Sequence, residues 1–306
     1  MVPLGGLRHQ YHRSPTCGTA SRYRRPDAAA HDAPVSSAIL RLASPILSLV
    51  LILSFNPPAV AASPGSFDLA TLAQARTDLA TLVNDERDGQ GLVALRLDPE
   101  AMAIAEQRAE TMAAMDVLSH TGPDGRTVFD AITAAGIPWF AAGEVLVWNN
   151  YPAEPESTGQ AVSAWLDSPS HRSIILSSDY NYAGFGAAVS SKTGNRYYSG
   201  ILLKRPDKTG GWTKAGPASI EVLDATSVRV TIRWTGSDTR LQVLTAGLRD
   251  FEVQRRVGAG SWRSLGLTTH TSLSVIVTRG RAHEFRVRLR DKAGNRGAWS
   301  SVSVTT

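Results

Sequence analysis

Cysteine is nearly missing from this sequence, since the chain of 306 residues holds only Cys17. That residue lies in an N-terminal segment that we expect to be removed, so the mature chain would contain no cysteine. This excludes disulfide bonds, thiolate metal sites and cysteine-based catalysis. The fold must therefore rest on core burial, which two domains of about 90 to 140 residues can supply.

Long hydrophobic runs are also missing. The apolar run at residues 46–55 has about ten residues, half of the roughly twenty that a membrane-spanning helix needs. Arg41 precedes it, and Ala59-Val60-Ala61 follows as a small-x-small cleavage pattern. We therefore predict that residues 1–61 are a leader with a signal peptide, that the protein is secreted and that no membrane span is retained. A retained anchor is the less favoured alternative, and the 45 residues ahead of the run leave the true translation start open.

Several catalytic motifs do not occur. The sequence has no Gly-x-Ser-x-Gly elbow and no glycine-rich phosphate loop, which argues against an elbow-type serine hydrolase and against nucleotide chemistry. It also has no His-Glu-x-x-His pair that would place two metal ligands on one helical face.

Charge divides the chain into two parts. Charged residues make up only 19% of the sequence and hydrophobic residues 42%, which favours a folded protein. Residues 63–205 hold 10 Lys and Arg against 17 Asp and Glu, whereas residues 217–306 hold 14 against 7. An acidic half followed by a basic half predicts two modules. We place them at 68–204 and 217–306, with a linker at 205–216.

The first half has the periodicity of helices. Asp98-Pro99 is a helix start, because an N-cap acceptor precedes proline at the first helical position. Thr127 with Asp130, and Ser168-Pro169, begin two further helices. Residues 183–189 and 196–203 are typical of a strand hairpin, so this half is predicted to be α+β. One stripe of the helix after Pro99 carries Ala101, Ile104, Ala105, Arg108, Met112 and Met115.

The second half switches to a period of two. Val228, Val230, Ile232 and Trp234 alternate with polar residues, and about seven short strands fit within 217–306. This pattern predicts an all-β sandwich. We expect His270 and His283 to be surface residues.

Four short motifs occur in an order that carries a family resemblance. They are Ser119-His120, Gly143-Glu144, the stretch from Trp165 to Arg172, and Gly184-Phe185-Gly186. Together they resemble the secreted bacterial form of the CAP superfamily (cysteine-rich secretory, antigen 5 and pathogenesis-related 1 proteins). The resemblance covers residues 68–204 and implies an α-β-α sandwich. In the second half, Trp234 ends its strand, a strand-like run extends from His283 to Asp291, and Gly294-Asn295 is followed by Trp299-Ser300. With these features, residues 217–306 resemble a fibronectin type III module.

The CAP resemblance implies that His120, Glu144 and His171 line a central cleft, with Glu144 in a turn. Two histidines and one carboxylate could hold zinc or another divalent metal, act as general acid and base, or be polar residues without chemistry. Spacing alone favours the last reading. This chain has Val145 where the family has Asn, and Ser168 where cysteine-rich members have a second glutamate. A metal would therefore have at most three protein ligands.

Three functions stay open at this stage, and the sequence does not decide whether the protein is an enzyme. The leading hypothesis is a secreted protein of the cell envelope or extracellular space that binds a small, lipid-like or cell-wall ligand, with or without a divalent metal. The first alternative is a peptidase-like or cell-wall hydrolase using the His/Glu site. The second is an adhesion protein acting through the C-terminal sandwich. The face carrying Arg286, Arg288 and Arg290 is solvated, a contact for an anionic polymer, or a docking surface for the acidic first domain. Nucleic acid is not an expected partner.

Overall fold

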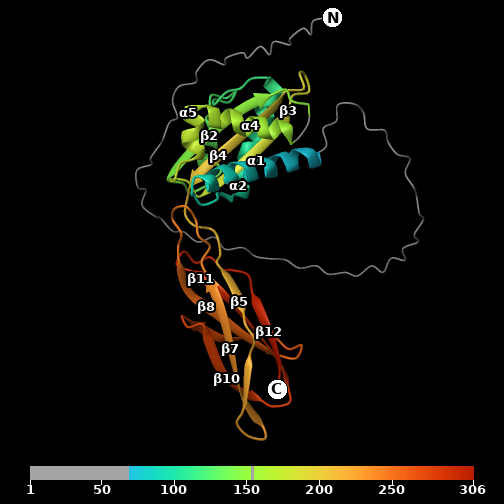
Figure 1. The fold of residues 1–306 in the computed structure, drawn as a ribbon, viewed down its shortest axis with the longest axis vertical. Helices are drawn as coiled ribbons and strands as arrows, with labels where there is room; N and C mark the ends of the chain where they lie inside the picture. The colour runs from blue at the N-terminus through green and yellow to red at the C-terminus, as the bar shows by residue number, and fades with distance from the viewer. Residues whose placement is uncertain (1–68, 153–154) are drawn as a thin grey trace, which may run out of the picture.

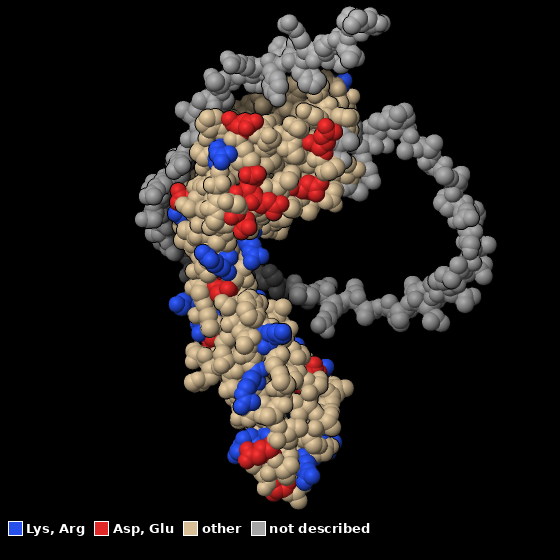
Figure 2. Space-filling model, viewed as in Figure 1, with Lys and Arg blue, Asp and Glu red and all other residues tan. Residues whose placement is uncertain are grey.

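The computed structural model describes residues 69–152 and 155–306, which form two modules (Figure 1). The predictions for the leader, the signal peptide and Cys17 lie outside these residues. Within the described ranges no helix is both long enough and apolar enough to cross a membrane. Figure 2 shows acidic side chains gathered over one face of the first module, with Lys and Arg distributed along the second.

The first module is built on a four-stranded sheet in the order β1-β3-β4-β2. Strands β3 (Tyr182–Val189) and β4 (Arg196–Lys204) form the predicted hairpin, and β2 (Ala141–Asn149) pairs antiparallel with the other edge of β4. The short β1 (Arg96–Leu97) runs parallel to β3. Nearly all of β3 and β4 is buried, because helices cover both faces of the sheet.

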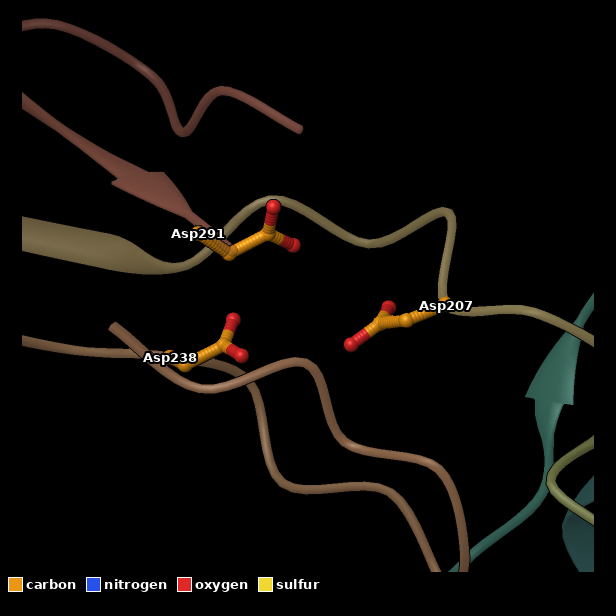
Figure 3. A group of neighbouring side chains, drawn as sticks. All are labelled: Asp207, Asp238 and Asp291. Atoms are coloured by element: carbon orange, nitrogen blue, oxygen red, sulfur yellow. The ribbon is translucent and has the colours of Figure 1, made fainter. Parts of the chain in front are cut away.

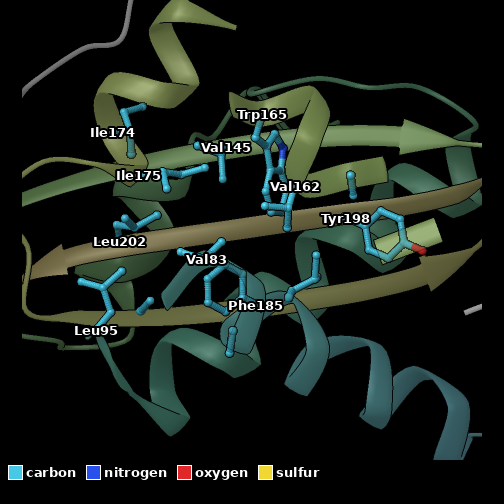
Figure 4. Packing of buried hydrophobic residues seen from close by; sticks show 14 of the residues in the cluster. Val83, Leu95, Val145, Val162, Trp165, Ile174, Ile175, Phe185, Tyr198 and Leu202 are labelled. Carbon is cyan, nitrogen blue, oxygen red and sulfur yellow. The ribbon is translucent and has the colours of Figure 1, made fainter. Parts of the chain in front are cut away.

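The helices form two outer layers around this sheet. Helices α1 (Leu69–Gly89), α4 (Glu156–Asp167) and α5 (Pro169–Ile175) pack on one face, and α2 (Pro99–Met115) and α3 (Val128–Ala134) pack on the other. The predicted α-β-α sandwich is confirmed. Trp165 of α4 is fully buried and lies 6.5 Å, between ring centroids, from Phe185 of β3 (Figure 4).

All three helices begin where the sequence signals predicted, and two of them have the predicted capping bonds. The Asp98 side chain accepts hydrogen bonds from the backbone N–H groups of Glu100 and Ala101, and Thr127 with Asp130 forms a capping box. The prediction for Ser168 is wrong in one respect. Ser168 stands at the N-cap of α5, but its hydroxyl pairs with the Ser170 hydroxyl and makes no capping bond to the backbone.

The second module consists of two packed sheets, as predicted. One has the order β10-β7-β5, with β6 also paired to β7, and the other has the order β12-β11-β8-β9. Phe251, Phe285 and Trp234 lie in the core between them. The strands are β5 (Trp212–Ala215), β6 (Ser219–Val222), β7 (Ser227–Ser237), β8 (Leu248–Val257), β9 (Arg263–Thr268), β10 (Ser272–Thr278), β11 (Ala282–Asp291) and β12 (Ser300–Thr305).

One histidine of this module is not where we expected it. His270 is exposed, but His283 is buried, with 4% of its surface accessible. His283 stands in β11 two residues before Phe285, and alternate residues of a strand share a face. It therefore points into the core.

The two modules contact each other directly at their junction. Gln242 of the β7–β8 loop accepts a hydrogen bond from the Val93 backbone, and the Asn181 side chain donates to the backbone carbonyls of Arg205 and Val243. Leu241, in the same loop, packs into the core on the α2 side of the first module. Within residues 205–216, β5 already belongs to a sheet of the second module.

Candidate functional site

The structure brings His120, Glu144 and His171 together from three separate elements. His120 follows α2, which ends at the left-handed residue Asp116, and His171 lies in α5. Glu144 is in the middle of β2, opposite Ile201 of β4, and not in the turn that the resemblance implied. The residues after Glu144 explain this difference, because the run from Val145 to Val147 is apolar and suited to a buried strand.

His120 is hydrogen-bonded to Glu144. The His120 Nδ1 atom lies 2.7 Å from Glu144 Oε2, and the exposed fractions of the two side chains are 39% and 3%. The Glu144 carboxylate forms ion pairs and therefore only accepts hydrogen bonds. The hydrogen of this bond consequently belongs to His120 Nδ1. The Nε2 atom of a neutral His120 is then an acceptor, on a side chain that is partly exposed.

Arg108 of α2 is the part of the site that the sequence analysis did not single out. Its Nε donates to Glu144 Oε1 at 2.8 Å, and its Nη2 donates to Glu144 Oε2 at 3.3 Å and to the Ser119 carbonyl at 2.8 Å. The Arg108 side chain is 10% exposed. The signal was visible, because Arg108 interrupts an otherwise apolar stripe of α2, and a charge in such a stripe needs a buried partner.

His171 completes the site as a second imidazole. Its ring centroid lies 6.4 Å from that of His120. Burial lowers the pKa of His171 below its ordinary value, and the nearby His120 lowers it further, whereas Glu144 acts in the opposite direction. The net direction is downward, which favours the neutral imidazole.

This lowered pKa predicts a pH dependence of stability. The unfolded chain protonates His171 near its ordinary pKa of about 6.5, whereas the folded chain resists protonation until a lower pH. The free energy of unfolding should therefore fall as pH drops from about 6.5 toward the folded pKa. Urea midpoints at a series of pH values should show a steeper acid loss in wild type than in His171→Gln. Identical profiles would contradict the prediction, and His270→Gln, at an exposed site, should match wild type.

The donor set does not fit the three-ligand metal site suggested by the sequence. Both oxygens of Glu144 already contact Arg108 or His120, so Glu144 stands behind His120 and not beside it as a ligand. The ligand atoms of His120, Glu144 and His171 also do not all lie within 4.8 Å of one another. Two imidazoles remain, fewer than the three or four protein ligands typical of zinc sites.

We accordingly expect purified full-length protein to contain far less than one zinc ion per chain. Metal content of wild type and of His120→Ala/His171→Ala, measured by mass spectrometry after purification without chelator, should be equally low. Near-stoichiometric zinc that is lost in the double variant would contradict this expectation.

Among the described residues, three carboxylates do come within 4.8 Å of one another at the module junction: Asp207, Asp238 and Asp291. Figure 3 shows that they come from three separate segments. Each one is used by backbone groups. Asp207 accepts from Thr209 and Ala246, Asp238 from Thr239 and Gly247, and Asp291 from Asn295. These bonds tie the junction loops together.

The arginine face of β11 is occupied by internal contacts. Arg288 Nε donates to Glu252, and Arg290 Nε donates to Asp250 at 2.6 Å, both across to β8. Arg286 donates to Gln254 and lies 4.1 Å above the ring centroid of Trp262 and 4.3 Å from that of Trp299. These contacts favour a structural role for the face, and binding of an anionic polymer there stays a prediction.

Comparison with known proteins supports the CAP resemblance of the first module. The model of the CAP family, described as the cysteine-rich secretory protein family, matches residues 80–202. The uncharacterized protein YkwD of Bacillus subtilis is 28% identical over 119 residues, which is 39% of this chain and 44% of YkwD. The chain thus spans less than half the length of that relative.

Two solved structures are similar to one module each. An extracellular protein containing an SCP domain from Bacillus anthracis is 19% identical, with a TM-score of 0.40 over 46% of this chain and 45% of that one. The sixth fibronectin type III domain of human fibronectin type III domain containing protein 3 is 16% identical, with a TM-score of 0.24 over 33% of this chain and 89% of the domain. Residues 80–202 are thus a CAP domain, the domain of the cysteine-rich secretory protein family.

Proposed function

We propose that this is a secreted CAP-domain protein of the cell envelope or extracellular space that binds a small polar ligand at His120 and His171. The observation that carries the proposal is the 2.7 Å contact between His120 Nδ1 and the buried Glu144. It leaves His120 Nε2 as an acceptor for a hydroxyl or amide N–H group, which cell-wall sugars and peptides carry in abundance.

The neighbouring His171 supports the same ligand class. Its lowered pKa favours a neutral ring, so it can add an acceptor or a donor without adding charge. Two imidazoles whose ring centroids lie 6.4 Å apart can each hydrogen-bond a ligand that carries several hydroxyl or amide groups. Secretion rests on the export pattern of residues 1–61, which lie outside the described part of the chain.

Hydrolysis is the second candidate function, and the same contact favours it. A histidine whose Nδ1–H is held by a carboxylate is the arrangement that general-base catalysis uses, with Nε2 taking a proton from water. In this reading His120 is the base and Glu144 orients it. No bond or substrate is specified by the geometry.

The test uses the full chain labelled with ¹⁵N-histidine and a mixture of soluble muropeptides as the probe. We expect the imidazole signals of His120 and His171 to shift on addition of the mixture, while that of the exposed His270 stays unchanged. In His120→Gln, the apparent affinity obtained from the His171 shift should be at least tenfold weaker. No shift at either ring, or an equal shift at His270, would overturn the binding proposal.

The hydrolysis alternative is separated by product analysis of the same samples. New amino groups or reducing ends that appear with wild type and vanish in a folded His120→Gln variant would support it. Equal product release by wild type and His120→Gln would exclude His120 as the base.

A further inference from the structure

The Glu144 carboxylate is hydrogen-bonded by both Arg108 and His120, although no Lys or Arg stands near Glu144 in the sequence. We propose that Arg108 is a positioning residue, which clamps Glu144 and thereby fixes the tautomer and orientation of His120. The clamp follows from the contacts among Arg108, Glu144 and His120. Only the role of His120 in binding a ligand rests on the proposed function.

The first step is the geometry of the ion pair. Arg108 approaches Glu144 with two nitrogens, Nε to Oε1 at 2.8 Å and Nη2 to Oε2 at 3.3 Å. A two-point contact between a planar guanidinium and a carboxylate restricts rotation of the carboxylate as well as its position. The remaining short contact of Oε2, at 2.7 Å, is to His120 Nδ1. Arg108 therefore determines which way the acceptor for His120 faces.

The second step is the contact with the backbone next to His120. Arg108 Nη2 also donates to the carbonyl of Ser119, at 2.8 Å. One guanidinium thus holds both the partner of the imidazole and the residue that precedes it in the chain. Because α2 carries Arg108 and packs closely on β3 and β4, this support comes from a rigid element.

Without Arg108, the Glu144 carboxylate would lose its guanidinium partner. The Glu144 side chain is 3% exposed, and a buried carboxylate that loses its guanidinium partner either moves or takes up a proton. In either case His120 would no longer face a fixed acceptor. A lysine would restore the charge but not the two-point contact, since an ammonium group lacks the guanidinium fork.

The test reads the tautomer of His120 directly, from its ¹⁵N shifts and two-bond ¹H couplings in the full chain at neutral pH. Wild type is expected to show His120 with a protonated Nδ1 and an unprotonated Nε2. Arg108→Met should shift His120 toward the Nε2–H tautomer, and Arg108→Lys should give an intermediate mixture. Arg196→Met is the matched control, because Arg196 is also a buried arginine of the first module but bonds the carbonyls of Tyr151 and Pro152.

Arg108→Met leaves a buried charge and could unfold the module, so Arg108→Met/Glu144→Gln is the second variant. The neutral amide that Glu144→Gln introduces is tolerated without a cation. It can present either its oxygen or its nitrogen to His120. We expect it to fold and to show both tautomers of His120.

A wild-type tautomer in folded Arg108→Met, or in the folded double variant, would overturn the positioning role. So would an equal change of tautomer in Arg196→Met. Failure of the proposed function looks different: the tautomer would respond to Arg108 as described, but muropeptides would shift neither His120 nor His171.

Discussion

A Gly186→Ala variant is expected to lose the native fold of the first module. The added Cβ would lie 2.1 Å from the Ala105 carbonyl oxygen and 2.2 Å from its carbon, inside the backbone of α2. Backbone atoms of a packed helix cannot yield as a flexible side chain can, so α2 would have to move off the sheet. We expect a loss of more than about 4 kcal/mol in the free energy of unfolding, beyond the usual range for a point variant. Urea unfolding of the full chain, with soluble yield as a second readout, measures it.

The matched control is Gly159→Ala. Gly159 lies inside α4, and a Cβ there meets nothing within 4 Å. Alanine in place of an interior helical glycine should stabilise the protein by about 0.5 to 1 kcal/mol. A loss of no more than about 1 kcal/mol in the free energy of unfolding of Gly186→Ala would contradict the close contact between β3 and α2. Gly184, whose Cβ would lie 2.2 Å from the Ala101 carbonyl carbon, should behave like Gly186. This close contact is the physical reason for the Gly184-Phe185-Gly186 motif.

The second large effect is expected for Arg205→Met at the module junction. Arg205 forms an ion pair with Asp98, and the exposed fractions of the two side chains are 1% and 2%. It also contacts Glu100 at 2.9 Å. Removing the guanidinium leaves the Asp98 carboxylate buried without a cation, which costs about 3 to 5 kcal/mol. Asp98 is also the N-cap of α2, so the helix that carries Arg108 starts at the damaged pair.

Two further variants separate this charge effect from a general loss of packing. Arg205→Met/Asp98→Asn keeps an N-cap acceptor but removes the buried charge, so it should recover a large part of the loss. Arg229→Met breaks the ion pair with Glu221, whose side chains are 42% and 60% exposed, and should cost less than about 1 kcal/mol. Equal urea midpoints for Arg205→Met and Arg229→Met would contradict the prediction.

The sequence was sufficient wherever the signal was local. Asp98-Pro99 marked the start of α2 because a cap and a first-position proline act within three residues. The alternation from Val228 to Trp234 showed a strand with one buried face, and that face is in the core. The same rule applied to β11 would have placed His283 inside with Phe285, so that error was avoidable.

What the sequence could not provide was the pairing of distant residues. Arg108 and Glu144 are 36 positions apart, and no spacing rule connects a helix residue with a strand residue on another element. The junction depends on contacts such as Val93 with Gln242, 149 positions apart, and residues 212–215 read as a linker because a strand of four residues has no clear period. The three residues of the candidate site came from a family resemblance, and the hydrogen bond between His120 and Glu144 came from the structure.

The most direct test of the account is the tautomer of His120 in the wild-type full chain, beside Glu144→Gln. Wild-type His120 is expected to carry its proton on Nδ1 and to present an unprotonated Nε2, because Glu144 Oε2 lies 2.7 Å from Nδ1. In Glu144→Gln the ring should populate both tautomers. A wild-type His120 in the Nε2–H tautomer, or one that does not respond to Glu144→Gln, would contradict the claim that this carboxylate prepares His120 to accept a proton or a hydrogen bond.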